Sequence, residues 1–423
     1  MGIEIYFKFI LSFALILLAA RIGGEIFERY LKQPPVLGEL VAGIIISPFA
    51  LGCFINDPII LNFATVQDAF GLHEFNVMEV ISEIAVITLL FVAGVETDVR
   101  AFLRQGVTGT LVAAGGVILP FVFGFFITMW LAPEVKIAGW LFMGAALTAT
   151  SIGLTVRILM EMGRLHTKAG TTILVGAVID DIISIVVLSM VIGISAATKG
   201  GKEISALQVT VDAIRIAVLG FAIWFALLII GVRFNKYISR FLLFPFKRSG
   251  TMPIMAIIVG FMIAYLVTLV ELHPVVGAYV AGLMFAATEE REEIVEHTRP
   301  IMLFLAPFFF CYLGMQVDMR LLWASAVIAV ILIVAAVVGK VIGCYIPAKF
   351  AGKMSHTEGL IVGIGMVPRG EVGLIIAGAG LLSGAIGREL FGAAVAVSVV
   401  TTLITPTMLK PFFKRQSALD EGD

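Results

Sequence analysis

Two adjacent carboxylates, Asp180 and Asp181, interrupt an apolar stretch that runs from about Thr171 to Ser195 and holds no other charge. The stretch is long enough to span a bilayer, where a charged side chain costs roughly 2.5–3.5 kcal/mol on insertion scales. Neighbouring carboxylates also repel each other, so this arrangement is unfavourable unless a cation or a proton regularly binds there. The pair therefore points to transport of ions or protons.

Three more ionisable residues are expected at membrane depth: Lys340 in one apolar segment, and Arg369 with Glu371 in another. If these and the two aspartates are all ionised, their formal charges sum to −1. One monovalent cation or one proton then neutralises the cluster, so the two ligands would compete for it. Consecutive residues of a helix point about 100° apart, so one aspartate can pair with Lys340 while the other faces a water-filled cavity.

Composition indicates a polytopic membrane protein. The chain has 423 residues and 14% charged residues and a mean hydropathy of +1.06, whereas soluble domains carry about 25% charged residues. Windows of about 20 apolar residues predict an all-α protein of about thirteen spanning helices. The expected spans are 5–22, 36–55, 78–97, 107–132, 138–160, 170–195, 207–232, 252–271, 274–288, 299–316, 321–346, 358–382 and 388–410.

Basic residues divide unevenly between the loops. Twenty follow the odd-numbered helices or lie in the C-terminal region, against seven on the other side. Since cytoplasmic loops are rich in Lys and Arg, we expect the N-terminus outside and the C-terminus in the cytoplasm. The first segment lacks a basic start and a small-residue cleavage site, so we interpret it as a spanning helix, not a signal peptide.

The sequence repeats itself. Pro35–Gly43 resembles Pro274–Gly282, and Gly94–Arg100 resembles Gly314–Arg320. With the spacing of the second match kept, Ser151–Leu154 falls on the segment that starts at Glu371. Each match lies seven helices from its partner, which places the copies in opposite orientations. Inverted repeats of this kind are typical of secondary transporters, whose sites lie near the midplane on broken helices.

Two of the expected helices carry signs of a break near the membrane centre. Pro368 and Gly370 interrupt span 358–382, where the proline removes a backbone donor. Span 138–160 has small and polar residues at the equivalent depth, among them Thr148, Thr150 and Ser151. Unwound backbone would offer oxygens to an ion. We expect Thr150 and Ser151 to be ligands, whereas Thr148 fits ordinary helix packing equally well.

Several charged residues also fit a purely structural role. Lys340 could extend to the cytoplasmic interface, and Arg369 with Glu371 could form a structural ion pair. Glu39 lies at a helix end or packing seam, where a structural or gating role is expected. The sequence holds no nucleophile–base set or Gly-rich phosphate loop, which argues against an enzyme. Its histidines form no ligand cluster, so neither a transition metal nor another cofactor is expected.

These residues carry a resemblance to the second branch of the monovalent cation:proton antiporter superfamily, which includes NapA-like Na⁺/H⁺ antiporters and Kef-type K⁺/H⁺ systems. The resemblance covers almost the whole chain. The matching stretches, in order, are Gln33–Leu40, Leu89–Asp98, Thr148–Gly153, Ile179–Asp181, Pro307–Phe310, Gly339–Lys340 and Pro368–Leu374.

The resemblance implies a NhaA/NapA-like fold and a homodimer in the cell (inner) membrane, with a core that moves like an elevator and a role in pH homeostasis. The dimerisation panel would comprise residues 1–106 and 251–320, and the core transport domain residues 107–200 and 321–415. Residues 201–250 would hold the linker helix, and 416–423 a short cytoplasmic tail. The partners are monovalent cations, protons and the bilayer, with no nucleic acid.

Carried over by position, Asp181 resembles the carboxylate that binds ion and proton, and Asp180 the partner that releases Lys340 when the ion binds. Thr150 and Ser151 would supply oxygens, with Glu371 nearby and Arg369 as its structural partner; a purely structural pair stays open for the last two residues. Family members with paired aspartates are similar to electrogenic antiporters. Kef-type members usually have Gln before the Asp and a nucleotide-sensing domain, and this sequence departs from both.

The resemblance thus favours electrogenic exchange of Na⁺, or Li⁺, for H⁺ without excluding K⁺. A Kef-type K⁺/H⁺ antiporter is the first alternative. A Na⁺-coupled symporter of an organic solute is another, although it would want a larger cavity and would not need Lys340. A channel explains the buried charges less well, because a charge-neutralising site would trap an ion instead of letting it pass. A membrane sensor explains them less well too, because it has no evident need for a costly buried charge cluster.

Overall fold

The computed structural model describes residues 2–48, 50, 65–67, 74–200, 206–234, 237, 241, 243–247, 251–269, 272–317 and 325–420. Within this part of the chain, seven helices are long and apolar enough to cross a membrane. A short hairpin is the exception to the all-helical expectation: β1 (Thr65–Gln67) pairs antiparallel with β2 (Glu74–Asn76). The chain is therefore a polytopic helical membrane protein.

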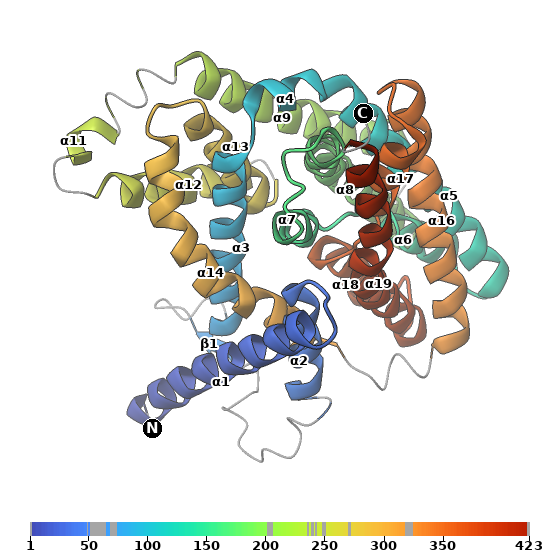
Figure 1. Cartoon of the computed structure of the whole chain (residues 1–423). Helices are drawn as coiled ribbons and strands as arrows, with labels where there is room; N and C mark the ends of the chain where they lie inside the picture. Colours follow the sequence, from blue (N-terminus) through green and yellow to red (C-terminus); the bar gives the residue numbers. More distant parts are fainter. Residues whose placement is uncertain are drawn as a thin grey trace.

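The helices form two groups that are distinct in Figure 1. The first contains α1 (Gly2–Arg29), α2 (Pro35–Ile46), α3 (Val77–Glu96), α12 (Met252–Thr268), α13 (Pro274–Ala286) and α14 (Arg291–Met315). The second contains α5 (Gly106–Leu131), α6 (Ile137–Ala146), α8 (Lys168–Gly200), α16 (Ala326–Phe350), α17 (His356–Gly365), α18 (Glu371–Leu382) and α19 (Arg388–Asp420).

Three helices lie between or beside these groups. α7 (Ile152–Glu161) contacts α2 and α3 of the first group and α8 of the second. α9 (Ala206–Arg233) packs against both α8 and α13, so it bridges the groups. The short α4 (Val99–Arg104) joins α3 to α5, and α11 (Phe244–Lys247) precedes α12.

The two expected breaks are present. Span 138–160 is divided into α6 and α7, and span 358–382 into α17 and α18. Several other expected ends are wrong. α1 continues seven residues past 22, and α2 ends at Ile46, nine residues before 55. α14 begins at Arg291, eight residues before the expected start at 299, and α19 continues ten residues past 410. Glu292 and Glu293 fall in the first turn of α14, where negative charge is favourable near a helix N-terminus.

The sequence repeat reappears as a repeated helix contact. α2 packs against α14 where a Cβ at Gly43 would overlap the backbone of Cys311, and a Cβ at Gly314 would overlap that of Leu40. α13 packs against α3 in the same way, through Gly282 and Gly94. Since Gly43 aligns with Gly282 and Gly94 with Gly314, the two crossings are equivalent. Only a residue without a side chain permits this approach.

Candidate ion-binding site

The two breaks cross each other in the middle of the second helix group. The backbone N–H of Ser151 donates to the carbonyl of Pro368 over 2.9 Å, which ties one break to the other. The hydroxyl of Thr150 donates to Met366 O over 3.2 Å. A Cβ at Gly370 would lie 2.5 Å from Ser151 Oγ, so a larger residue there would force Ser151 to shift. The crossing brings four half-helix ends to one place.

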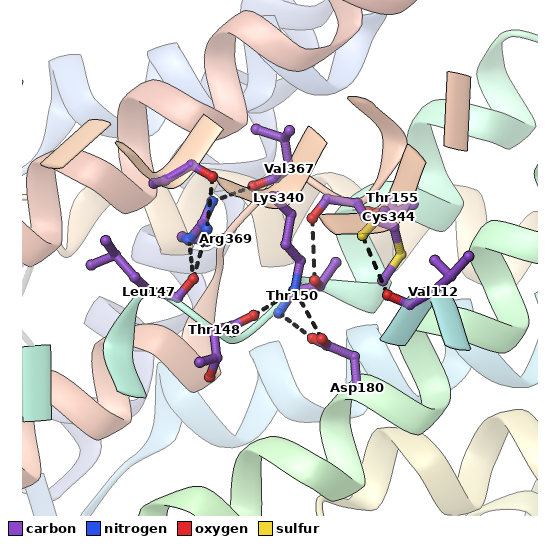
Figure 2. A network of polar contacts seen from close by, with 12 residues as sticks. Val112, Leu147, Thr148, Thr150, Thr155, Asp180, Lys340, Cys344, Val367 and Arg369 are labelled. Atoms are coloured by element: carbon purple, nitrogen blue, oxygen red, sulfur yellow. Dashed lines mark hydrogen bonds and ion pairs between the residues drawn. The ribbon is translucent and has the colours of Figure 1, made fainter. Parts of the chain in front are cut away.

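Asp180 of α8 and Lys340 of α16 meet beside this crossing (Figure 2). Their Oδ1 and Nζ atoms are 2.8 Å apart, and both side chains are fully buried. Lys340 also donates to Thr148 O over 2.6 Å, while Asp180 Oδ2 accepts the backbone N–H of Thr150 over 2.9 Å. The alternative in which Lys340 extends to the membrane surface is therefore wrong.

The charges complement the dipoles of the half-helices. Leu147 is the C-terminal cap of α6, and Thr148 follows it, so Lys340 lies at a carbonyl-rich helix end. Ser151 is the N-terminal cap of α7, and Asp180 accepts from the residue before it. A cation at a helix C-terminus and an anion at an N-terminus are each favourable. The break thus stabilises the ion pair.

Arg369 holds the carbonyl ends of both breaks. Its guanidinium donates twice to Leu147 O, over 3.1 and 2.6 Å, and once to Val367 O over 2.8 Å (Figure 2). A further bond of 3.3 Å reaches Ala336 O on α16. Arg369 is 1% exposed, and a buried guanidinium requires several acceptors of this kind. Its geometry is that of a cross-link between α6, the second break and α16.

Asp181 follows Asp180 on α8 and is 3% exposed. Both aspartates are thus shielded from bulk water in this conformation. Ser151 and Ser184 are buried, and their Oγ atoms have no hydrogen-bond partner among the described residues. Ser184 lies one turn beyond the aspartate pair on the same helix face. Unsatisfied hydroxyl oxygens next to carboxylates are suitable ligands for a hard cation such as Na⁺.

Glu371 is the first residue of α18, and its side chain lies outside the described part of the structure. The expected ion pair between Glu371 and Arg369, and the ligand role of Glu371, therefore stay predictions. The structure does bring the backbone of the break that precedes Glu371 into contact with Thr150 and Ser151.

Two residues of the site were not found from the sequence. Ser398 and Thr402 of α19 both donate to Arg369 O, over 2.9 and 2.8 Å. This carbonyl is freed by the break before α18, so the two hydroxyls replace its helical partner. Their spacing of four residues on an apolar helix places them on one face, and this was the available signal.

Comparisons with known proteins agree with this geometry. The transmembrane sodium/hydrogen exchanger family matches residues 11–415 of the chain. The chain belongs to the sodium/hydrogen exchanger family. A high-affinity Na⁺/H⁺ antiporter, NhaS3 of Synechocystis, is 34% identical over 96% of this exchanger and 90% of its own length. The Na⁺/H⁺-K⁺ antiporter GerN of Bacillus cereus is 33% identical, over 96% and 97%.

The fold of this exchanger is also similar to a solved structure. The sodium proton antiporter MjNhaP1 from Methanocaldococcus jannaschii superposes with a TM-score of 0.68, covering 96% of each chain. The two sequences are only 17% identical, so this likeness concerns the fold. Family membership rests on the sequence matches, which cover nearly the whole exchanger.

Proposed function

We propose that this protein exchanges Na⁺, or Li⁺, for protons across the membrane, and that Asp181 is the carboxylate for which the two ligands compete. The single observation that carries the proposal is the buried Asp180–Lys340 pair at the crossing of two broken helices. This pair holds Asp180 at the crossing and places the carboxylate of Asp181, the next residue of α8, beside it. Family membership supports the same assignment.

The proposed reaction releases two protons for each Na⁺ that binds. Asp181 holds a proton when no cation is bound, and it loses this proton as Na⁺ binds to the carboxylate. Na⁺ also competes with Lys340 for Asp180, so the ammonium loses its partner in a buried setting and releases a proton. Two protons then leave for one Na⁺, and each exchange moves one net charge. Exchange by this route is electrogenic.

The ligand set of the proposed site consists of oxygen atoms. Asp181 and Asp180 supply carboxylates, Thr150 and Ser151 supply hydroxyl or carbonyl oxygens, and Glu371 lies at the same break. Oxygen ligands suit Na⁺ and Li⁺, and also K⁺ if the site is wider. The printed name of the relative GerN includes K⁺, which favours K⁺ as a second candidate substrate.

We further propose that the two helix groups act as dimerisation panel and moving core in an elevator cycle, within a homodimer. Two cavities beside the first helix group support access to the site. One of about 260 Å³ is lined by α1, α2, α7 and α14, and includes Arg157. Another of about 290 Å³ is lined by α3, α14, α18 and α19, and includes Leu374. Each borders a half-helix that leads away from the crossing.

The test uses purified protein in liposomes that contain a pH-sensitive dye. We expect added Na⁺ to drive proton movement in wild type and not in Asp181→Asn. The matched control is Asp98→Asn, which makes the same chemical change at an exposed carboxylate outside the site. Li⁺ and K⁺ are added in parallel. Proton movement that does not depend on any cation would contradict the exchange function.

A further inference from the structure

A second buried charge cluster lies between α2 and α7, away from the aspartate pair. Arg157 Nη2 of α7 is 3.5 Å from Glu39 Oε1 of α2, and Arg157 Nε is 2.5 Å from Glu161 Oε1 on its own helix. Glu161 Oε2 also accepts the backbone N–H of Val36 over 3.4 Å. These contacts attach the end of α7 to the beginning of α2.

Glu39 is only partly compensated in this cluster. Its side chain is 1% exposed, its one ion pair is long, and Oε2 has no hydrogen-bond partner among the described residues. An ionised carboxylate ordinarily accepts about four hydrogen bonds, so the charged form of Glu39 is poorly stabilised here. A proton on Oε2 would remove that deficit.

The unpartnered oxygen belongs to a residue that lines the cavity of about 260 Å³. In the orientation expected from the loop charges, this cavity opens to the cytoplasm. Three arginines and four glutamates line it, with a formal net charge of −1. The charged and titratable groups that face Glu39 from α1, α7 and α14 are Arg21, Glu25, Glu28, Arg157, Glu161, Arg299 and Cys311.

We propose that Glu39 is a second proton-binding carboxylate, and that its protonation from the cytoplasmic cavity releases Arg157 and weakens the attachment of α7 to α2, which then depends on the long bond between Glu161 and Val36. The inference rests on the proposed exchange function. Protonation converts the Glu39 carboxylate into a neutral acid, which no longer attracts the guanidinium. Arg157 keeps its bond to Glu161, so it is not left buried and unpaired by the release.

α7 connects this contact to the ion site. Its N-terminal cap is Ser151, and Arg157 lies six residues farther along the same helix, a rise of about 9 Å. A short helix moves as a rigid unit, so displacement of α7 from α2 also displaces Thr150, whose N–H binds Asp180. Protonation at Glu39 thus governs how readily the ion site switches from opening on one side of the membrane to opening on the other.

The test compares Na⁺/H⁺ exchange rates at saturating Na⁺ while the pH on the cytoplasmic side is varied. In wild type we expect the maximal rate to rise as this pH falls. Glu39→Gln imitates the protonated acid, so its rate should stay high with a flattened pH profile. Glu28→Gln, at an exposed glutamate of the same cavity, is the matched control and should keep the wild-type profile.

Equilibrium ²²Na⁺ binding separates this inference from the exchange function. Glu39→Gln should bind Na⁺ with wild-type affinity, since Asp181 is unchanged. If Glu39→Gln does not fold, Glu39→Gln/Arg157→Gln/Glu161→Gln removes all three charges of the cluster and should show the same flattened profile. A folded variant whose pH profile equals that of wild type overturns the role of Glu39. Wild-type protein without Na⁺-driven proton movement instead overturns the exchange function.

Discussion

At the scale of single residues, Asp180 and Asp181 point to different sides of α8 although they are adjacent in the chain. Asp180 has an ammonium group and a backbone N–H within hydrogen-bond distance. Asp181 lies about 100° around the helix and is the slightly exposed member of the pair. Asp180 is thus held by these two bonds in this conformation, and Asp181 is the carboxylate proposed to bind the exchanged ion and proton.

Removing one partner of the buried pair should destabilise the protein more than removing both. Asp180→Asn leaves Lys340 without its counter-ion, which costs about 3–5 kcal/mol for a buried pair. Asp180→Asn/Lys340→Gln removes both charges and should recover much of this loss. Thermal unfolding in detergent measures the difference. A double variant that is less stable than Asp180→Asn would contradict the pairing.

Arg369 should be sensitive to replacement by lysine although the charge is retained. Its guanidinium donates to three carbonyls in different directions, which one ammonium group cannot reproduce. Hydrogen bonds from charged groups contribute about 1.5–3 kcal/mol each, so Arg369→Lys should lower the unfolding temperature markedly. Arg388→Lys, at the exposed start of α19, is the control. Equal unfolding temperatures for the two variants would argue against the cross-link.

At the scale of helices, the crossings of α3 with α13 and of α2 with α14 depend on glycine. Gly94→Ala and Gly282→Ala place a methyl group against the backbone of the partner helix. Overpacking of this kind costs about 1–3 kcal/mol. Gly106→Ala is the control, because a Cβ there meets no atom within 4 Å among the described residues. Comparable stability of all three variants would exclude the close approach.

The cap of α4 gives a pH-dependent contribution outside the membrane-spanning helices. Asp98 accepts the N–H groups of Ala101 and Arg100, and these bonds, the first above all, hold the pKa of its carboxyl below the usual 3.8. A carboxyl whose pKa is lowered by folding contributes its full stabilisation at pH values above its usual pKa. This stabilisation is lost as the pH falls through the lowered pKa.

Asp98→Ala should therefore destabilise the protein by about 1 kcal/mol at neutral pH, since it removes an N-cap. In strong acid the difference from wild type should shrink, because a neutral carboxyl still accepts these bonds but more weakly, and Asp98→Asn should keep most of the cap at neutral pH. Unfolding by denaturant at several pH values measures this. A difference that grows as the pH falls would show that the capping argument is wrong.

The helix breaks were predictable from sequence because polar or charged residues accompany the helix-weakening ones at membrane depth, as Pro368 and Gly370 on either side of Arg369 show. Proline alone does not decide it, since helices such as α5 and α14 continue through internal prolines. The start of α14 was not predictable, because its first turns are charged and the apolar stretch begins only near residue 299. The bonds of Arg369 to backbone carbonyls of three segments were not predicted, and its pairing with Glu371 stays a prediction. Such contacts depend on how distant segments cross, which residue spacing within one helix does not encode.

At the scale of the whole molecule, the proposed stoichiometry predicts an electrical signal. If one Na⁺ exchanges for two protons, turnover in liposomes generates a membrane potential and slows until an ionophore dissipates it. In Asp180→Asn we expect this dependence on the ionophore to vanish, because Lys340 no longer changes its partner during the cycle. Exchange by wild type that is unaffected by the ionophore would contradict electrogenic transport.

The central claim is competition between Na⁺ and a proton for Asp181, and equilibrium binding of ²²Na⁺ to purified protein at several pH values tests it most directly. Competition with one proton weakens the apparent Na⁺ affinity by about tenfold for each pH unit below the pH at which the site takes up its proton. We expect this slope or a steeper one in wild type and in Asp98→Asn, and no Na⁺ binding in Asp181→Asn. Affinity that is independent of pH, or binding that survives in Asp181→Asn, would contradict the account.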